Sequence, residues 1–199
     1  MAVNKDPILK RCRYLGISPT VVGVDKSSNR NPGANTRRKV SEYGLQLKEK
    51  QKLKFIYGVL EKQFYHYYEL ATKMEGSAGG NIVTLLESRL DNVVYRMGFA
   101  MTRREARQLV CHGHFLVNGK KVDIPSYRLK VGDVVTLKEK DRTNVKFKEN
   151  LEATASYVVP SWLDVDRENF QATVNRMPVT EDLDYEVEAH LIVELYSKQ

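Results

Sequence analysis

The chain has 199 residues, of which 42% are hydrophobic, and carries a net charge of +7 at neutral pH. This apolar content can form a core for one large or two small domains, while no run approaches the roughly 18 apolar residues that a membrane span needs. The sequence begins without an apolar signal segment, and its two cysteines, Cys12 and Cys111, lie far apart. We therefore expect a cytoplasmic protein, not bound to a membrane and without a disulfide framework.

The charge is distributed unevenly along the chain. Residues 1–54 contain 13 lysines and arginines against 4 acidic residues, and residues 81–148 contain 14 against 7, whereas residues 149–199 contain 3 against 11. A net charge of +7 is compatible with an ordinary solvated surface, but two separate basic segments favour binding to a polyanion. The acidic end would face away from that polyanion or neutralise basic neighbours.

The first half of the chain has two different sequence patterns. Residues 1–44 are rich in Pro, Ser, Asn and Gly and lack apolar periodicity, which predicts a basic extended arm, partly disordered without a partner. Residues 45–74 have the periodicity of one helix, with apolar side chains on one face and lysines on the other. The stretch EGSAGGN at 75–81 breaks this pattern and predicts a linker.

Two further helices are predicted after this linker. Apolar residues at helical spacing indicate a helix over 82–97, which Gly98 would end as a C-terminal capping glycine. Thr102 and Glu105 form a capping-box pattern, so a third helix begins there and ends at Gly113.

The remaining elements are predicted to be short strands and helices. Asn118–Gly119 and Gly132–Asp133 are predicted as the turns of two hairpins, so residues 81–140 would hold two helices and about four strands. RTNVKFKENLEATAS predicts a helix, WLDVDRENFQATVNRM two strands and YEVEAHLIVELYSK a terminal helix, although HLIVELY fits a strand equally well.

The segment CHGHFLVNG at 111–119 raises the question of a metal or catalytic site. A structural zinc site needs four ligands, usually as two pairs, and the other cysteine and histidines of the chain are isolated. Catalysis by Cys111 would need a base and an orienting group in the correct geometry, which adjacency in sequence does not give. We predict no metal site and no catalytic residue here, and interpret Cys111 as a small side chain near a helix end.

A second motif, SRLD at 88–91, resembles the catalytic signature of RNA pseudouridine synthases, in which the aspartate is the nucleophile. Those enzymes carry the aspartate on a loop of a separate catalytic domain. Here the helical periodicity continues through the motif and predicts Asp91 in the middle of a helix. Arg89 lies on the apolar stripe, so we expect it to tie this helix to its neighbour through a carboxylate or carbonyl.

One face of the third helix is suited to phosphate groups. Arg104, Arg107, Gln108 and Cys111 share one side of a helical projection, and Arg103 lies at its edge. Arginine binds phosphate oxygens through two donors at once, and glutamine can add a neutral hydrogen bond. The hairpin and the loop after it add polar, aromatic and cationic residues: Asn118, Lys120, Lys121, Ser126, Tyr127 and Arg128. This mixture suits structured RNA, which is recognised largely through its backbone and shape.

Three blocks of the sequence resemble one known family. LLESRLDNVVYRMGFAMTRREARQLVCHGHFLVNGKKVDIPSYRLKVGDVV at 85–135 resembles the RNA-binding module of bacterial small-subunit ribosomal protein S-four, a module also found in tRNA synthetases, heat-shock proteins and pseudouridine synthases. SEYGLQLKEKQKLKFIYGVLEKQF at 41–64 resembles the first helical region of that ribosomal protein, and EAHLIVELYSK at 188–198 resembles its C-terminal signature. The resemblance thus extends over nearly the whole chain.

The resemblance implies a structural, non-enzymatic protein of the small ribosomal subunit that needs no cofactor. It implies a primary binder of the five-prime domain of 16S ribosomal RNA that nucleates subunit assembly. Neighbouring small-subunit proteins and messenger RNA at its point of entry are further implied partners, with a role in translational accuracy. Many members carry four zinc-binding cysteines near the N-terminus, where this sequence has only Cys12, so it resembles the zinc-free type.

The predicted RNA-binding residues fall into two groups. Those of the module are Arg103, Arg104, Arg107, Gln108, His112, His114, Asn118, Lys120, Ser126, Tyr127 and Arg128. Those of the first block and the end of the arm are Arg37, Arg38, Tyr43, Lys48, Lys50 and Lys52. The alternatives are an RNA-modifying enzyme that uses the same module as an anchor, and a free-standing regulator that associates with ribosomes transiently.

The predicted fold is α+β with three parts. Residues 1–44 form the basic arm, and residues 45–80 form a helical domain that the C-terminal helix at 186–199 completes. Residues 81–185 form a second domain, in which the RNA-binding module at 85–140 packs helices on a small, mainly antiparallel sheet.

Overall fold

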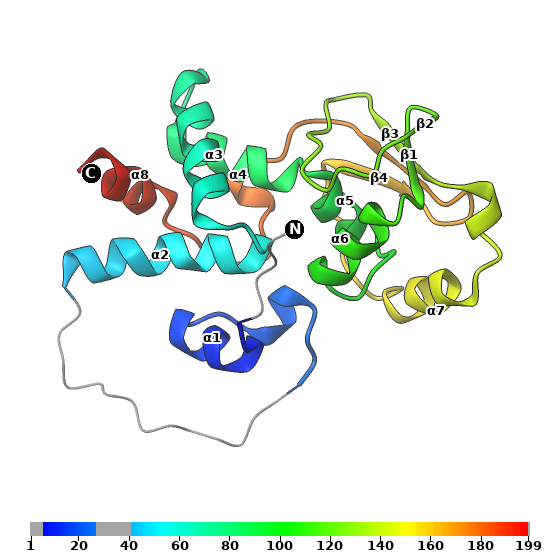
Figure 1. Ribbon diagram of the computed structural model, residues 1–199, viewed down its shortest axis with the longest axis horizontal. Helices are drawn as coiled ribbons and strands as arrows, with labels where there is room; N and C mark the ends of the chain where they lie inside the picture. The colour runs from blue at the N-terminus through cyan, green and yellow to red at the C-terminus, as the bar shows by residue number, and fades with distance from the viewer. Residues whose placement is uncertain (1–5, 27–40, 199) are drawn as a thin grey trace. The chain divides into compact units, whose positions relative to one another are not determined.

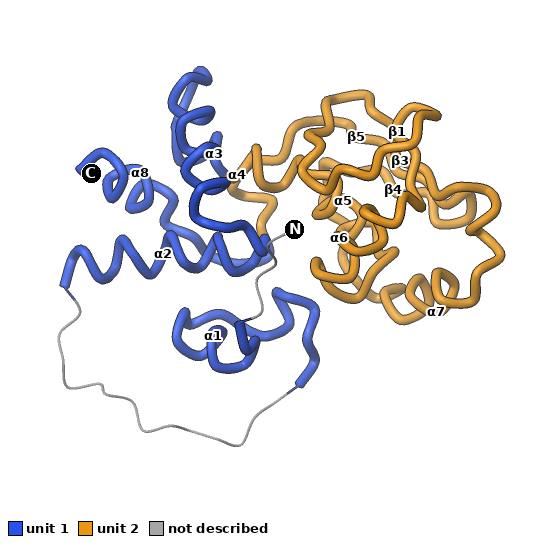
Figure 2. The backbone as a smooth tube through the Cα atoms, in the orientation of Figure 1, with its two compact units in different colours: residues 1–82, 184–199 blue, residues 83–183 orange. Residues whose placement is uncertain are grey.

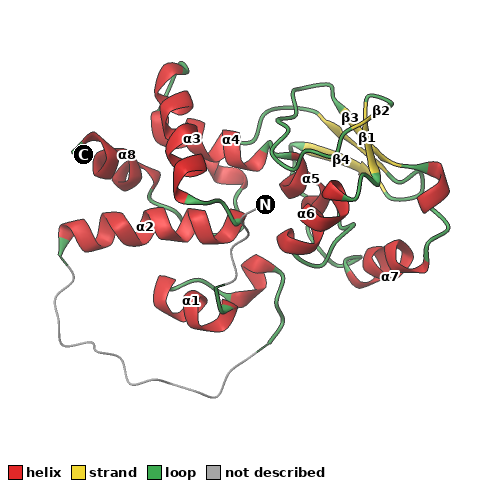
Figure 3. Ribbon diagram, viewed as in Figure 1, coloured by secondary structure: helices red, strands yellow, loops and turns green. Residues whose placement is uncertain are grey.

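The computed structural model describes residues 6–26 and 41–198, and the chain divides into two compact units (Figure 2). Unit 1 comprises residues 1–82 and 184–199, and unit 2 comprises residues 83–183. Helices occur together with a five-stranded antiparallel sheet (Figure 3), so the predicted α+β class is confirmed. Of the helices within the described residues, none has the length and apolar character to cross a membrane.

Unit 1 is built from helices that come from both ends of the chain (Figure 1). Its elements are α1 (Ile8–Leu15), the 3-10 helix η1 (Pro19–Val22), α2 (Glu42–Tyr57), α3 (Glu61–Lys73), the first half of α4 (Ala78–Glu87) and α8 (Ala189–Ser197). The terminal segment is thus a helix, as predicted, and it packs against α2. Gly79 approaches α8 so closely that an added Cβ would lie 3.0 Å from the Cβ of Ala189, which explains a small residue there.

The prediction of an extended arm is wrong for the part of residues 1–44 that the structure describes. Cys12 and Leu15 of α1 pack on Phe55 of α2 in a small apolar cluster, and this burial raises the pKa of the Cys12 thiol. A helix of two turns gives little periodic signal, and its apolar face is covered by a segment far along the chain. Arg37 and Arg38 lie outside the described residues.

The single helix predicted over 45–74 is two helices. Gly58 ends α2 in the left-handed conformation, with φ +62°. Its N–H and that of Val59 donate to carbonyls of the last turn, and α3 begins three residues later. The apolar periodicity continues across this break, which is why it suggested one helix.

Unit 2 combines short helices with the sheet. Its helical elements are α5 (Leu90–Arg96), α6 (Arg103–Cys111), α7 (Val145–Ala153) and the 3-10 helices η2 (Glu139–Asp141) and η3 (Thr180–Asp182). Its strands are β1 (Phe115–Val117), β2 (Lys120–Lys121), β3 (Val134–Leu137), β4 (Leu163–Asp166) and β5 (Gln171–Val174), arranged in the order β2-β1-β3-β5-β4. The hairpin at Asn118–Gly119 is confirmed, with both turn residues at positive φ. The predicted helix and two strands after residue 142 are also confirmed.

Two other local predictions in unit 2 are wrong. The helix predicted over 82–97 is broken at Ser88–Arg89, where Arg89 is extended and forms an isolated antiparallel bridge with Arg128. The second hairpin does not form, because β3 pairs with β1 and β5 and not with the residues before Gly132. Both errors have the same cause: backbone partners distant in sequence decided the outcome.

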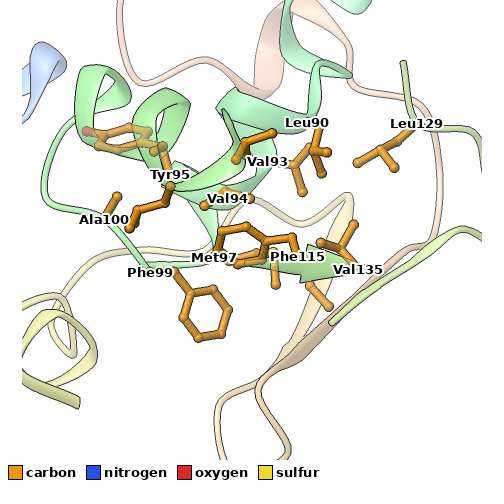
Figure 4. Packing of buried hydrophobic residues seen from close by; sticks show 14 of the residues in the cluster. Leu90, Val93, Val94, Tyr95, Met97, Phe99, Ala100, Phe115, Leu129 and Val135 are labelled. Carbon is orange, nitrogen blue, oxygen red and sulfur yellow. The ribbon is translucent and has the colours of Figure 1, made fainter. Parts of the chain in front are cut away.

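The core of unit 2 lies between α5, α6 and the sheet. Val94 of α5 and Met97, which directly follows α5, lie beside Phe115 of β1 and Val135 of β3 in one continuous cluster (Figure 4). Phe99 follows α5 and extends the cluster, with its ring centroid 5.9 Å from that of Phe115. Ala106, Leu109 and Val110 of α6 belong to the same cluster, so the opposite face of α6 remains available to solvent.

Candidate RNA interface

The N-terminus of α6 is firmly anchored. The Thr102 side chain accepts a hydrogen bond from the N–H of Glu105 (3.1 Å), as the capping-box pattern predicts, and Glu105 accepts one from the N–H of Met101 (2.9 Å). Burial raises the pKa of Glu105, but hydrogen bonds from Lys146, Met101 and Asn150 outweigh it and lower that pKa. The helix is therefore fixed at the end where its arginines begin.

The exposed face of α6 carries most of the residues predicted for it. Arg104 and Gln108 are exposed, and Arg107 and Cys111 are partly exposed on the same stripe, while Ala106, Leu109 and Val110 are buried. Arginine and glutamine at this spacing present donors along a line that a phosphate backbone can follow.

Arg103 lies beneath this face and not on it. Its Nε donates to Oδ1 of Asn92 (2.8 Å), its guanidinium carbon lies 4.4 Å from the centre of the Tyr95 ring, and the residue is buried. Arg103 therefore supports α6 from inside, and we leave it out of the proposed contact surface.

The loop with Ser126, Tyr127 and Arg128 is held against the break between α4 and α5. The N–H of Leu90 donates to the Tyr127 carbonyl (2.8 Å), and the N–H of Leu129 donates to the Ser88 carbonyl (2.9 Å). The three predicted contact residues are exposed on this fixed backbone.

The β1–β2 hairpin presents Lys120 and Lys121 to solvent, but the Asn118 side chain is used internally. Its Nδ2 donates to Asp133 (2.8 Å), and its Oδ1 accepts from the N–H of Val134 (2.9 Å). Asn118 and Asp133 thus link the hairpin to the start of β3, and Asn118 supports the backbone that carries the two lysines. The sequence pattern predicts Asp133 only as a turn residue and contains no signal for its bond to Asn118.

The two histidines of the Cys-His cluster have different surroundings, although their ring centroids lie 6.1 Å apart. His112 is exposed, whereas His114 Nδ1 lies 2.8 Å from Asp141 Oδ2 and its ring packs edge-on against Phe147. Within residues 6–26 and 41–198, no three His, Cys, Asp or Glu side chains meet in an arrangement that could hold a metal ion. His114 thus serves packing, while His112 stays a candidate RNA contact.

The residues of unit 1 that were predicted to bind RNA also divide into those that are exposed and those that bind other parts of the unit. Tyr43 is exposed and Lys48 partly exposed on α2, whereas the Lys50 side chain is only 8% exposed and its Nζ donates to Glu61 (2.8 Å). Lys52 bonds Glu49 (2.8 Å) and the Glu186 carbonyl (3.0 Å). Lys50 and Lys52 therefore join α2 to α3 and to the C-terminal segment.

Comparison with known proteins identifies the family. The ribosomal protein S4/S9 N-terminal domain matches residues 4–87, and the S4 domain matches residues 88–135. The small ribosomal subunit protein uS4 of Agathobacter rectalis is 56% identical over 198 residues that cover 100% of both chains. Proteins of the same name from Clostridioides difficile (60% identical, covering 95% of this chain and 96% of the relative) and Halothermothrix orenii (48%, 100% of both) are also similar. The chain belongs to the small ribosomal subunit protein uS4 family.

Membership of the uS4 family confirms a structural protein of the small ribosomal subunit, not an enzyme. The SRLD motif therefore has a role other than catalysis. The prediction that Asp91 lies in the middle of a helix is wrong, because Asp91 lies in the first turn of α5. Both of its carboxylate oxygens accept hydrogen bonds from Arg89. Arg89 was expected to tie its helix to a neighbouring element, but the carboxylate that it binds is that of Asp91, two residues along the same segment.

A second buried polar cluster in this uS4-family chain was not visible in the sequence. Glu87 accepts hydrogen bonds from Asn92 Nδ2 (2.8 Å) and from Nε (3.2 Å) and Nη2 (3.1 Å) of Arg96, and it lies 4.0 Å from Arg103. The carboxylate is 1% exposed, so these cations neutralise it inside the unit. Glu87 lies in a stretch of helical periodicity, and nothing in that pattern distinguishes a buried glutamate from a surface one.

Proposed function

We propose that this chain binds the five-prime domain of 16S ribosomal RNA through one surface of unit 2 and so nucleates assembly of the small subunit. The surface consists of Arg104, Arg107 and Gln108 on α6, the hairpin lysines and the loop at 126–128. We name this set the α6 surface. Its members come from three separate segments and are all at least partly exposed within one compact unit.

One observation carries this proposal: the cationic side chains of the α6 surface are displayed on backbone that is already fixed. The cap at Thr102, the Asn118–Asp133 link and the backbone bonds to residues 88–90 hold the three segments. A rigid cationic surface suits a folded RNA, which is recognised through shape and backbone more than through bases. Binding to such a surface costs less ordering entropy than binding to loose side chains.

Further partners follow from the same family resemblance. Messenger RNA near its point of entry and neighbouring small-subunit proteins are proposed, with an effect on translational accuracy. The segment at 149–199 has a negative net charge, with 3 basic against 11 acidic side chains. This charge supports contact with basic proteins more than with RNA.

The test is binding of the purified chain to a transcript of the five-prime domain. We expect Arg104→Ala with Arg107→Ala to weaken binding by about a hundredfold or more, because two charged hydrogen bonds of about 1.5–3 kcal/mol each are lost and every 1.4 kcal/mol is roughly a factor of ten. The dependence of log affinity on log salt should become shallower by about 1.4, since each lost phosphate contact removes roughly 0.7 from the slope.

A matched control removes the same charge elsewhere in unit 2. Lys140 and Lys148 are exposed and lie outside the α6 surface. Replacing both by alanine should change affinity much less than the arginine pair does. An equal loss for the two double variants would show that net charge, and not this surface, determines binding.

A further inference from the structure

The SRLD segment at 88–91 joins the parts of the α6 surface. Its backbone holds the loop, since Asp91 N–H donates to the Pro125 carbonyl (3.2 Å) and Leu90 N–H to the Tyr127 carbonyl (2.8 Å). Its Asp91 carboxylate lies 3.9 Å from Nη1 of Arg107 in the middle of α6. One short segment thus contacts two of the three groups from which the surface is made.

Two arginines, Arg89 and Arg107, face the carboxylate of Asp91. Arg89, 2% exposed, donates from Nε (2.9 Å) and Nη2 (2.6 Å) to the two oxygens of Asp91, which is itself buried. Arg107 is the more exposed cation of the pair that faces Asp91, with 18% of its side chain accessible. A buried carboxylate therefore faces one arginine that is inside the unit and one that reaches the surface.

We propose that Asp91 is a positioning residue for RNA binding, which orients the guanidinium of Arg107 before RNA arrives. The inference rests on the proposed function of the α6 surface. The distance of 3.9 Å between Nη1 of Arg107 and Oδ2 of Asp91 is longer than a hydrogen bond. A phosphate can therefore bind the Arg107 guanidinium without breaking a hydrogen bond between Arg107 and Asp91. In the low dielectric of a buried site the attraction still restricts the rotamers of a long side chain.

The restriction has a defined effect on affinity. Ordering one long side chain at an interface costs about 0.5–1.5 kcal/mol, which corresponds to roughly two- to tenfold in affinity. If Asp91 has already ordered Arg107, removing its charge should weaken RNA binding by that factor. The loss should depend on the presence of Arg107.

The test is a double-mutant cycle in the full-length chain with the five-prime-domain transcript. Asp91→Asn alone leaves Arg89 inside without its counter-ion, so the main variant replaces both partners, Arg89→Met with Asp91→Leu. Exchange of a buried ion pair for apolar residues of similar size is often neutral for folding, and it leaves the net charge unchanged. Circular dichroism and thermal unfolding confirm that the variant is folded.

We expect this pair variant to bind about two- to tenfold more weakly than the wild-type chain. In an Arg107→Ala background the same pair variant should have no further effect. Lys120→Ala is the matched control, because this exposed lysine belongs to the hairpin, the part of the α6 surface that the 88–91 segment was not found to contact. Its effect should add fully to that of the pair variant.

Each other outcome has a distinct meaning. A loss that is fully additive with Arg107→Ala would overturn the positioning role while leaving the proposed RNA surface intact. If Arg107→Ala alone did not affect binding, the assignment of Arg107 to the RNA surface would fail, and this inference with it. If the pair variant did not fold, Asp91→Asn would replace it in the same cycle, and additivity there would again overturn the positioning role.

Discussion

Glu87 should be among the residues on which the stability of unit 2 depends most. Its carboxylate is buried and is shared by Asn92, Arg96 and Arg103, with hydrogen bonds of 2.8–3.2 Å to the first two. Glu87→Ala removes the anion and leaves its cationic neighbours inside the unit without it. Breaking a buried ion pair by removing one partner costs about 3–5 kcal/mol. Since small domains have a total stability of about 5–15 kcal/mol, this loss would remove a large fraction of the stability of unit 2.

The assay is urea unfolding of the full chain, followed by the fluorescence of Trp162, which is buried in unit 2. Glu149→Ala on the exposed side of α7 is the control and should change the free energy of unfolding by less than about 0.5 kcal/mol. A loss below about 1 kcal/mol for Glu87→Ala, comparable with the control, would refute the view that this carboxylate holds the cluster together.

Two further predictions concern a carboxylate in unit 1 and a glycine in unit 2. Burial raises the pKa of Glu61, but hydrogen bonds from Lys50, Lys54 and Tyr196 outweigh it and lower the pKa to about 2. The ionised Glu61 carboxylate therefore contributes its full stabilisation above its ordinary pKa near 4.5, and this stabilisation is lost as pH falls toward 2. The difference in free energy of unfolding between wild type and Glu61→Gln should shrink over that pH range. A constant difference would contradict the ion pairing of Glu61. Gly98→Ala should destabilise unit 2 by about 2 kcal/mol or more, because φ is +84° and the new Cβ would lie 2.5 Å from Thr154 Oγ1. Gly132→Ala is the control for backbone strain alone, because Gly132 has φ +87° and an added Cβ would meet nothing within 4 Å. If thermal unfolding showed the same loss of stability for both glycine variants, a steric contribution from Thr154 would be excluded.

The sequence alone determined the elements whose signals are local. The cap at Thr102, the turn at Asn118–Gly119 and the end of α6 just before Gly113 depend on residues that are close to one another in the sequence. The family could also be inferred, because three blocks in order carry far more information than one motif. The exposed stripe with Arg104 and Gln108 followed from the helical period once the helix was correctly placed.

Only the tertiary structure decided which polar residues turn inward. Arg103 and Lys50 were predicted to face RNA, but Asn92 and Glu61 hold them inside the fold. The SRLD motif was expected within a helix, yet backbone bonds to residues 125–129 break the helix there. Sequence periodicity shows how polar each face of a helix is, but it cannot distinguish an arginine that is buried in an ion pair from one that is exposed to solvent. The partners that make burial possible come from other segments, so only the folded chain separates the exposed cations of the proposed RNA surface from those that are buried beside a polar or acidic partner.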